Sequence, residues 1–173
     1  MDPNATAAPL ILTLGFDAAS FARLDALRRA HFPPARNFIP AHLTLFHALP
    51  GDALQEIAAR LAQVAAATPP LKLSIGPPRS LGRGVALAVE GGGLCRLRRE
   101  LADGWAGMLS RQDQNGFRPH VTIQNKVAPD AARALLAELA ADFLPWPAEG
   151  ETLLLWHYRG GPWQAAAAFP LRG

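Results

Sequence analysis

The feature that most constrains this chain is a four-residue pattern that occurs twice. The two copies are His42-Leu43-Thr44-Leu45 and His120-Val121-Thr122-Ile123. Five histidines and six threonines in 173 residues give about 0.17 His-x-Thr triplets by chance. Either copy alone is therefore a weak signal, whereas the pair is a strong one. The pair predicts two strands that present the same side chains.

Apolar periodicity places the two copies at equivalent positions in a repeated order of elements. Each half reads strand, helix, strand, helix, strand, and each motif lies in the second strand of its half. We expect strands at about 9–14, 41–48, 71–75, 85–89, 119–124, 152–158 and 163–169. We expect helices at about 17–32, 52–68, 93–108 and 129–144, with a polar loop at 110–115. The pattern predicts one duplicated, two-lobed α+β domain over residues 1–173, with halves at about 8–78 and 84–173.

Composition and charge narrow the class of protein. Half of the residues are apolar, which argues against disorder, and no apolar run is long enough to cross a bilayer. The start of the chain lacks the basic residues of a signal peptide, and Cys95 is the single cysteine, which excludes an internal disulfide. The net charge of +3 weakly favours anionic ligands. We expect a soluble, cytoplasmic, monomeric protein with no membrane partner.

The spacing within each motif predicts a catalytic face. Residues i and i+2 of a strand point to the same side, so His42 and Thr44 share one face while Leu43 and Leu45 enter the core. The second motif repeats this arrangement. Two imidazoles in one groove suit general acid and base catalysis on a phosphodiester without a metal, because their ordinary pKa allows both protonation states near neutrality. Threonine hydroxyls suit the non-bridging phosphate oxygens.

At these residues the chain resembles the two-histidine (2H) phosphoesterase superfamily, in its bacterial branch of 2′-5′ RNA ligase-like and RNA 2′,3′-cyclic phosphodiesterase proteins. The segments 40–46 and 117–123 are similar to the two signature strands of that family, and the segment 163–171 is similar to its last strand. The resemblance implies a bilobal fold with two mainly antiparallel sheets that line a central groove, and with helices outside.

The resemblance also implies the chemistry. It implies that His42, Thr44, His120 and Thr122 act on 2′,3′-cyclic phosphates or 2′-5′ linkages without metal or nucleotide cofactor. It suggests the first histidine as acid and the second as base, although the symmetry of the motifs leaves these roles interchangeable. After its second motif the family often has an arginine, where this chain has Gln124-Asn125-Lys126, so Lys126 is the candidate replacement.

Several further side chains are candidates for base or phosphate contacts. Aromatic rings stack on bases in single-strand recognition, which makes Phe46, Trp156 and Tyr158 candidates, although core packing is the more common role for the last two. Phe46 shares strand parity with His42, which favours the groove. Arg118 and Lys126 are the candidate phosphate contacts.

Other residues are interpreted as structural. Parity places His47 on the face opposite His42 unless a bulge intervenes. We interpret three arginines that flank the groove in sequence as solvated surface charges, and three on the helix near residue 98 as its wet face. These are Arg36, Arg79 and Arg83, and Arg96, Arg98 and Arg99 respectively. His157 remains undecided.

These observations lead to one hypothesis and one alternative. The hypothesis is a metal-independent phosphodiesterase that opens 2′,3′-cyclic phosphates of RNA or nucleotides to 2′-phosphates, with 2′-5′ ligation as the reverse type of reaction. The motifs lack the companion histidines and carboxylates of a metal site. The alternative is a binding module that holds a nucleotide or RNA end in the same groove without turnover.

Overall fold

Residues 7–173, which are the part of the chain described by the computed structural model, form seven strands and five α-helices. The strands are β1 (Leu10–Phe16), β2 (Leu43–Leu49), β3 (Leu71–Ser80), β4 (Val85–Glu90), β5 (His120–Gln124), β6 (Trp146–His157) and β7 (Gln164–Pro170). The helices are α1 (Ala18–His31), α2 (Leu54–Ala67), α3 (Gly92–Gly104), α4 (Arg111–Gln114) and α5 (Pro129–Ala141). The expected α+β class is confirmed.

Local sequence explains where the helices begin and which face they bury. The Asp17 side chain accepts a hydrogen bond of 2.9 Å from the main-chain nitrogen of Ser20 and so caps α1. In α2, Ile57, Leu61 and Val64 recur at helical spacing and are all buried. The polar segment expected as a loop at 110–115 instead contains one helical turn, α4, capped by Ser110.

The strands form one antiparallel sheet in the order β2-β1-β6-β3-β4-β5, with β7 paired to β6. Two sheets were expected, but they are joined into one because β6 runs through both. Its first residues pair with β3, and its remaining residues pair with β1 and β7. The pairing changes at Gly150, where a Cβ atom would lie only 2.6 Å from the Leu14 side chain. A side chain there would therefore collide with the Leu14 side chain of β1.

β6 begins six residues earlier than expected. This early part of β6 contains Pro147, which pairs with Ser74 of β3. The residues of β6 before Gly150 pair only with β3, so they behave like an edge strand. A proline is tolerated there because one side of the backbone has no strand partner to bond.

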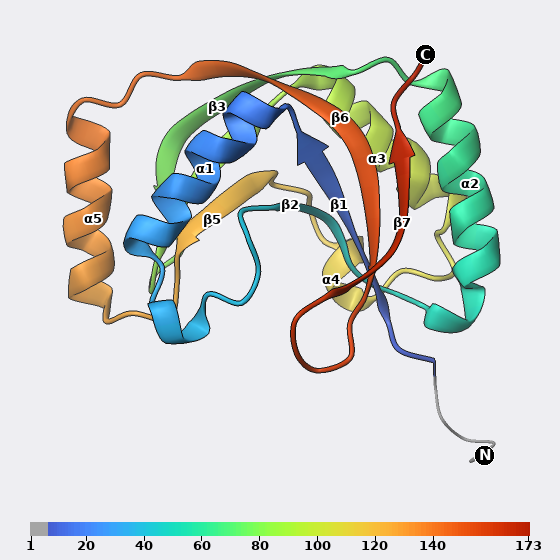
Figure 1. Cartoon of the computed structure of the whole chain (residues 1–173), viewed down its shortest axis with the longest axis horizontal. Coiled ribbons are helices and arrows are strands. Elements are labelled where there is room, and N and C mark those ends of the chain that lie inside the picture. The colour runs from blue at the N-terminus through green and yellow to red at the C-terminus, as the bar shows by residue number, and fades with distance from the viewer. Residues whose placement is uncertain (1–6) are drawn as a thin grey trace.

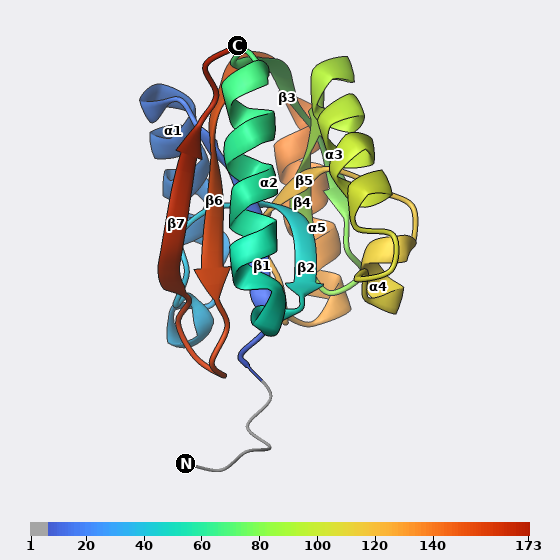
Figure 2. The ribbon, with the colours of Figure 1, turned by 90° about the vertical axis from the view of Figure 1, so that its right-hand side faces the viewer.

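The sheet is strongly curled and the helices cover its outer side (Figure 1). α1 packs on β5 and α5 packs on β3 and β4, while α2 packs on β6 and β7. Figure 2 shows α2 in front of the sheet, with α3 beside it. Helix α1 therefore follows β1 in the sequence but covers the strand of the second motif. Within residues 7–173, no helix is long and apolar enough to cross a membrane.

Candidate active site

The two motif strands, β2 and β5, are the two ends of the sheet order and contact each other. The curl of the sheet brings them together, since they share no backbone pairing. His42, Thr44, His120 and Thr122 are half-buried and line one cavity of about 560 Å³. The apolar residues between them, at 43, 45, 121 and 123, are buried in the core. The structure thus brings the four predicted side chains to one space.

Each motif histidine is fixed in the same way by a main-chain carbonyl two residues earlier. Nδ1 of His42 lies 2.8 Å from the Pro40 oxygen, and Nδ1 of His120 lies 2.7 Å from the Arg118 oxygen. A carbonyl oxygen only accepts, so Nδ1–H donates in both cases and Nε2 is left free. Each of the two imidazoles therefore offers its Nε2 for proton transfer.

Both imidazoles favour the neutral form in the free protein. Burial lowers the pKa of His42 to about 4; the Pro40 carbonyl opposes this shift, while the positive charge of Arg28 adds to it. Burial also lowers the pKa of His120, against the effect of the Arg118 carbonyl. The Arg79 guanidinium lowers it further, since its Nη2 lies 3.1 Å from Nδ1 of His120.

Two buried arginines tie the motif strands to helices. Arg28 of α1 donates from Nη1 to the Thr122 oxygen at 2.8 Å. Arg98 of α3 donates from Nε to the Leu45 oxygen at 2.7 Å and from Nη2 to the Asp113 oxygen at 2.7 Å. Because β2 and β5 are edge strands, these carbonyls have no strand partner on their outer side. The guanidinium groups satisfy them and hold each motif in place.

A bulge in β2 corrects two predictions at once. Thr13 of β1 pairs with Thr44 and Leu12 pairs with Phe46, so Leu45 is an extra residue. After the bulge the side chains change faces. Phe46 is fully buried, with its ring 5.2 Å from that of Trp105, and the expected base contact at Phe46 is wrong. His47 instead faces the same cavity as the motif residues.

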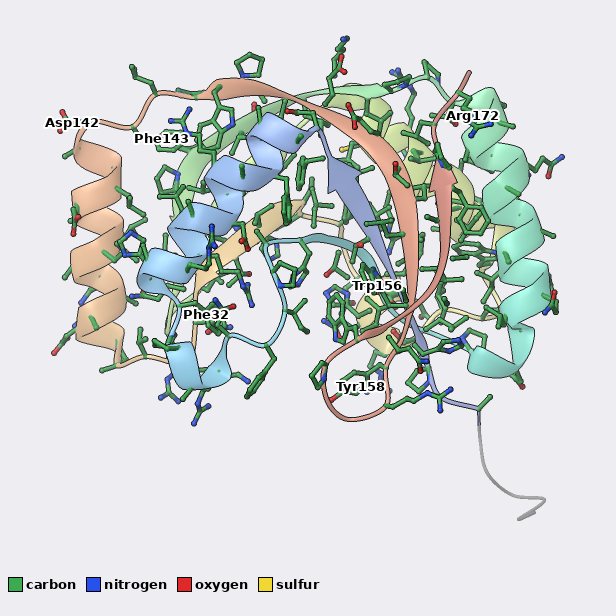
Figure 3. The ribbon with its side chains drawn as sticks, viewed as in Figure 1. Phe32, Asp142, Phe143, Trp156, Tyr158 and Arg172 are labelled. Carbon is green, nitrogen blue, oxygen red and sulfur yellow. The ribbon has the colours of Figure 1, made fainter. Side chains whose placement is uncertain are left out.

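The remaining candidates divide between the cavity and the surface. Arg118 lines the cavity, as predicted, whereas Lys126 is exposed and lies outside its lining. Tyr158 is exposed and lies at the end of β6 near the β6–β7 loop (Figure 3), outside the cavity. The predicted contacts of Lys126 and Tyr158 with a ligand in this cavity therefore have no geometric support.

Trp156 lies on the other side of His42, in a separate apolar cavity of about 250 Å³. Its Nε1 donates to the Thr13 hydroxyl at 2.9 Å. The ring of Trp163, from the β6–β7 loop, lies 4.7 Å from the His42 ring in an edge arrangement. Trp163 and His42 form the wall between the two cavities. The Trp163 side chain therefore packs against the His42 ring.

Besides His47 and the buried Arg28, sequence reasoning missed four residues that build the site. Arg79 and Arg98 line the cavity, although both were interpreted as solvated charges; Arg98 is buried. Asp113 is a buried carboxylate in the segment expected as a polar loop, and Trp163 was not singled out as a site residue. The patterns used for the prediction contain no signal for these positions, because each depends on a contact between distant segments. Among residues 7–173, no group of three or more His, Cys, Asp or Glu side chains is arranged to hold a metal ion.

A sequence profile of the 2′-5′ RNA ligase superfamily matches residues 16–162, so the chain belongs to this superfamily. This confirms the resemblance to the 2H phosphoesterases. The chain is similar to TT0787 of Thermus thermophilus, with 20% identity, a TM-score of 0.65, and coverage of 95% of this chain and 98% of that one. It is similar to E. coli LigT complexed with 3′-AMP, with 20% identity, a TM-score of 0.61, and coverage of 96% and 99%. No match was found among curated proteins.

These structural neighbours confirm the fold. Because their sequence identity to the chain is low, we draw only the fold from them. A structure described as a phosphoesterase is 22% identical, with a TM-score of 0.58 and coverage of 96% of this chain and 99% of that one. E. coli LigT has also been solved with phosphate, ATP and NADP+. Members of the superfamily are phosphoesterases and ligases, and the present chain shares their curled antiparallel sheet.

Proposed function

We propose that the protein is a metal-independent phosphodiesterase that opens 2′,3′-cyclic phosphates to 2′-phosphates. The observation that carries this proposal is the pair of imidazoles in one cavity, each with Nδ1 held by a carbonyl and Nε2 free. LigT of E. coli, which shares the fold, has been solved with nucleotides and phosphate. We extend that ligand class to this chain.

The chemistry needs one proton acceptor and one proton donor. Nε2 of one histidine takes a proton from water as the water oxygen attacks phosphorus. The bond between phosphorus and the 3′ oxygen breaks, and that oxygen receives a proton from Nε2 of the other histidine. The hydroxyls of Thr44 and Thr122 donate to the non-bridging oxygens, on which negative charge grows. Following the family resemblance, we assign His42 as acid and His120 as base.

Ligation is the same type of step with a different nucleophile. A 5′-hydroxyl takes the place of water, attacks the cyclic phosphate and leaves a 2′-5′ linkage. The same two proton transfers balance this step. Hydrolysis or ligation then depends on which nucleophile occupies the cavity.

The direct test is turnover of a 2′,3′-cyclic nucleotide in the presence of EDTA. We expect activity in the wild type, and a loss of about a hundred- to ten-thousand-fold in His42→Ala and in His120→Ala. His31→Ala is the control, because His31 lies outside the cavity. Full activity in both motif variants, or loss of wild-type activity with EDTA, contradicts the proposal. Nucleotide binding without any turnover supports the binding-module alternative.

A substrate with sulfur in place of the 3′ oxygen shows which histidine is the acid and which is the base. A thiolate leaves without a proton, so this substrate needs no acid. We expect it to restore much of the activity lost in His42→Ala but little of that lost in His120→Ala. The opposite pattern reverses the assignment.

A further inference from the structure

His47 is a third histidine in the cavity, and neither motif contains it. The bulge at Leu45 turns its side chain toward the cavity lined by His42 and His120. Its side chain is 46% exposed, so it faces solvent rather than the core. The two motif histidines already provide an acid and a base. His47 is therefore available for another task at the same site.

Asp113 holds the His47 imidazole in a fixed orientation. Its Oδ1 accepts from Nδ1 of His47 at 3.0 Å and from the main-chain nitrogen of His47 at 2.8 Å. Its Oδ2 accepts from the main-chain nitrogen of Ala48 and from the Ser110 hydroxyl, each at 3.0 Å. The Asp113 side chain is only 1% exposed. A carboxylate bound on both oxygens is rigid, so it fixes the plane of the His47 ring.

The free nitrogen of His47 suits an anion. Nδ1 is engaged with Asp113, which leaves Nε2 as the only ring nitrogen that a ligand can reach. His42 and His120 donate to neutral carbonyls, whereas His47 is paired with a carboxylate that balances the charge of an imidazolium. An imidazolium at this position donates Nε2–H to a phosphate oxygen, a charge-assisted hydrogen bond.

The cavity has the size and charge for more than one phosphate. Its volume of about 560 Å³ lies within the range of pockets that hold complete small-molecule ligands. Arg79, Arg98 and Arg118 line it, and among its described lining residues Asp113 is the single carboxylate. Both oxygens of that carboxylate already accept hydrogen bonds from protein groups, which compensate its negative charge. The wall therefore favours a ligand with several negative charges.

We propose that His47, held by Asp113, forms a second phosphate subsite that binds the phosphate on the 5′ oxygen of the nucleotide whose cyclic phosphate reacts. This proposal rests on the proposed function and refines its substrate class. The preferred substrates are then RNA ends or 5′-phosphorylated cyclic nucleotides, in place of a cyclic nucleotide with a 5′-hydroxyl. Both substrates carry a phosphate at the same oxygen.

The test compares kcat/KM for three substrates. They are a 2′,3′-cyclic nucleotide with a 5′-hydroxyl, the same compound with a 5′-phosphate, and a dinucleotide that ends in the cyclic phosphate. We expect the wild type to prefer at least one phosphorylated substrate by about ten- to a hundredfold, the effect of one hydrogen bond to a charged group. Preference for the dinucleotide identifies an RNA diester as the source, and preference for the 5′-phosphate alone identifies a terminal monoester.

Two substitutions separate the role of Nε2 from the support of Asp113. In His47→Asn the amide nitrogen replaces Nδ1 and still reaches Asp113, but nothing replaces Nε2. In His47→Gln the amide nitrogen lies near the position of Nε2. We expect the substrate preference to fall to about one in His47→Asn and to survive in part in His47→Gln. His31→Ala is the matched control and should retain the wild-type ratio. A wild-type ratio of one, or an unchanged ratio in His47→Asn, overturns the subsite.

A binding measurement tests the subsite without turnover. We expect the wild type to bind a nucleoside 2′,5′-bisphosphate more tightly than a nucleoside 2′-phosphate by about the same factor, and His47→Asn to lose the difference. If the wild type turns over no substrate, the proposed function fails, while the two affinities still decide whether the subsite exists. Equal affinities in the wild type overturn the subsite alone.

Discussion

Nη1 of Arg28 lies 2.8 Å from the main-chain oxygen of Thr122, although the two residues are 94 positions apart in the chain. This contact joins helix α1 to the strand of the second motif. Arg98 provides the equivalent contact from α3 to the Leu45 oxygen of the first motif strand. Each motif strand is thus held by a buried guanidinium from a helix of the other half of the sequence. This reciprocal arrangement links the folding of the domain to the assembly of the cavity.

Replacement of Arg98 tests this arrangement. Arg98→Met keeps the apolar stem but leaves the oxygens of Leu45 and Asp113 buried without a donor. We expect the free energy of unfolding to fall by about 2 to 4 kcal/mol, as measured by urea denaturation. The adjacent Arg99 is exposed, so Arg99→Met should change stability by less than about 0.5 kcal/mol. Equal losses in the two variants would show that the buried hydrogen bonds contribute little.

The pH dependence of kcat/KM follows from the two motif histidines. The proposed reaction needs one imidazole neutral and one protonated, and kcat/KM reports the free enzyme. The pKa of His42 is lowered to about 4 and that of His120 is lowered below its ordinary 6.5. At any given pH both are thus less protonated than a free imidazole. We expect a bell-shaped profile centred below pH 6.5, measured with a cyclic nucleotide that stays a monoanion throughout.

A second variant checks the cause of that shift. Arg79→Gln removes the positive charge beside His120, so the pKa of His120 should rise and the profile should move to higher pH. A wild-type profile centred above pH 6.5, or one that does not move in Arg79→Gln, contradicts the electrostatic account.

The threonine hydroxyls are tested by substitution with valine, which keeps the shape and strand propensity of threonine. We expect Thr44→Val and Thr122→Val each to lower kcat by about a hundredfold, the effect of one donor to a developing oxyanion. Thr152 lies on β6, outside the cavity, so Thr152→Val should keep the wild-type kcat. If Thr44→Val and Thr122→Val retain wild-type kcat, the hydroxyls do not contact the reacting phosphate.

The Asp113 carboxylate is tested by its effect on stability at different pH values. Burial raises its pKa, but the hydrogen bonds from His47, Ala48 and Ser110 lower it to about 2 from an ordinary 3.8. Between these values the unfolded chain binds the proton more readily, so the stabilisation is present above pH 4 and is lost as the pH falls toward 2. We expect Asp113→Asn to lower the free energy of unfolding at pH 7 by about 2 kcal/mol, and the difference from wild type to narrow in acid.

The matched control for Asp113 is Asp142, an exposed residue just after α5 (Figure 3) that does not line the cavity. Asp142→Asn should change stability by less than about 0.5 kcal/mol at any pH. A constant difference between wild type and Asp113→Asn from pH 7 to pH 3 would mean that the hydrogen bonds do not favour the ionised carboxyl.

The sequence by itself determined the order of elements and the four motif side chains. Alternation within a strand is a local property, so His42 and Thr44 could be separated from Leu43 without knowledge of the fold. The same reasoning failed for Phe46 and His47. The bulge at Leu45 exists because of the pairing with β1, and it moves Phe46 into the core and His47 into the cavity.

Only the tertiary structure decided what completes the cavity. Helical periodicity shows which side of a helix is polar but not what covers it, so the buried Arg98 resembled a solvated charge. The long-range contacts of Arg98, Asp113 and Arg79 lie 15 to 66 positions away in the chain. The curl of one continuous sheet brings these segments together around the two motifs. Local sequence therefore specified the four motif side chains, and long-range packing specified their charge environment, their orientation and the cavity around them.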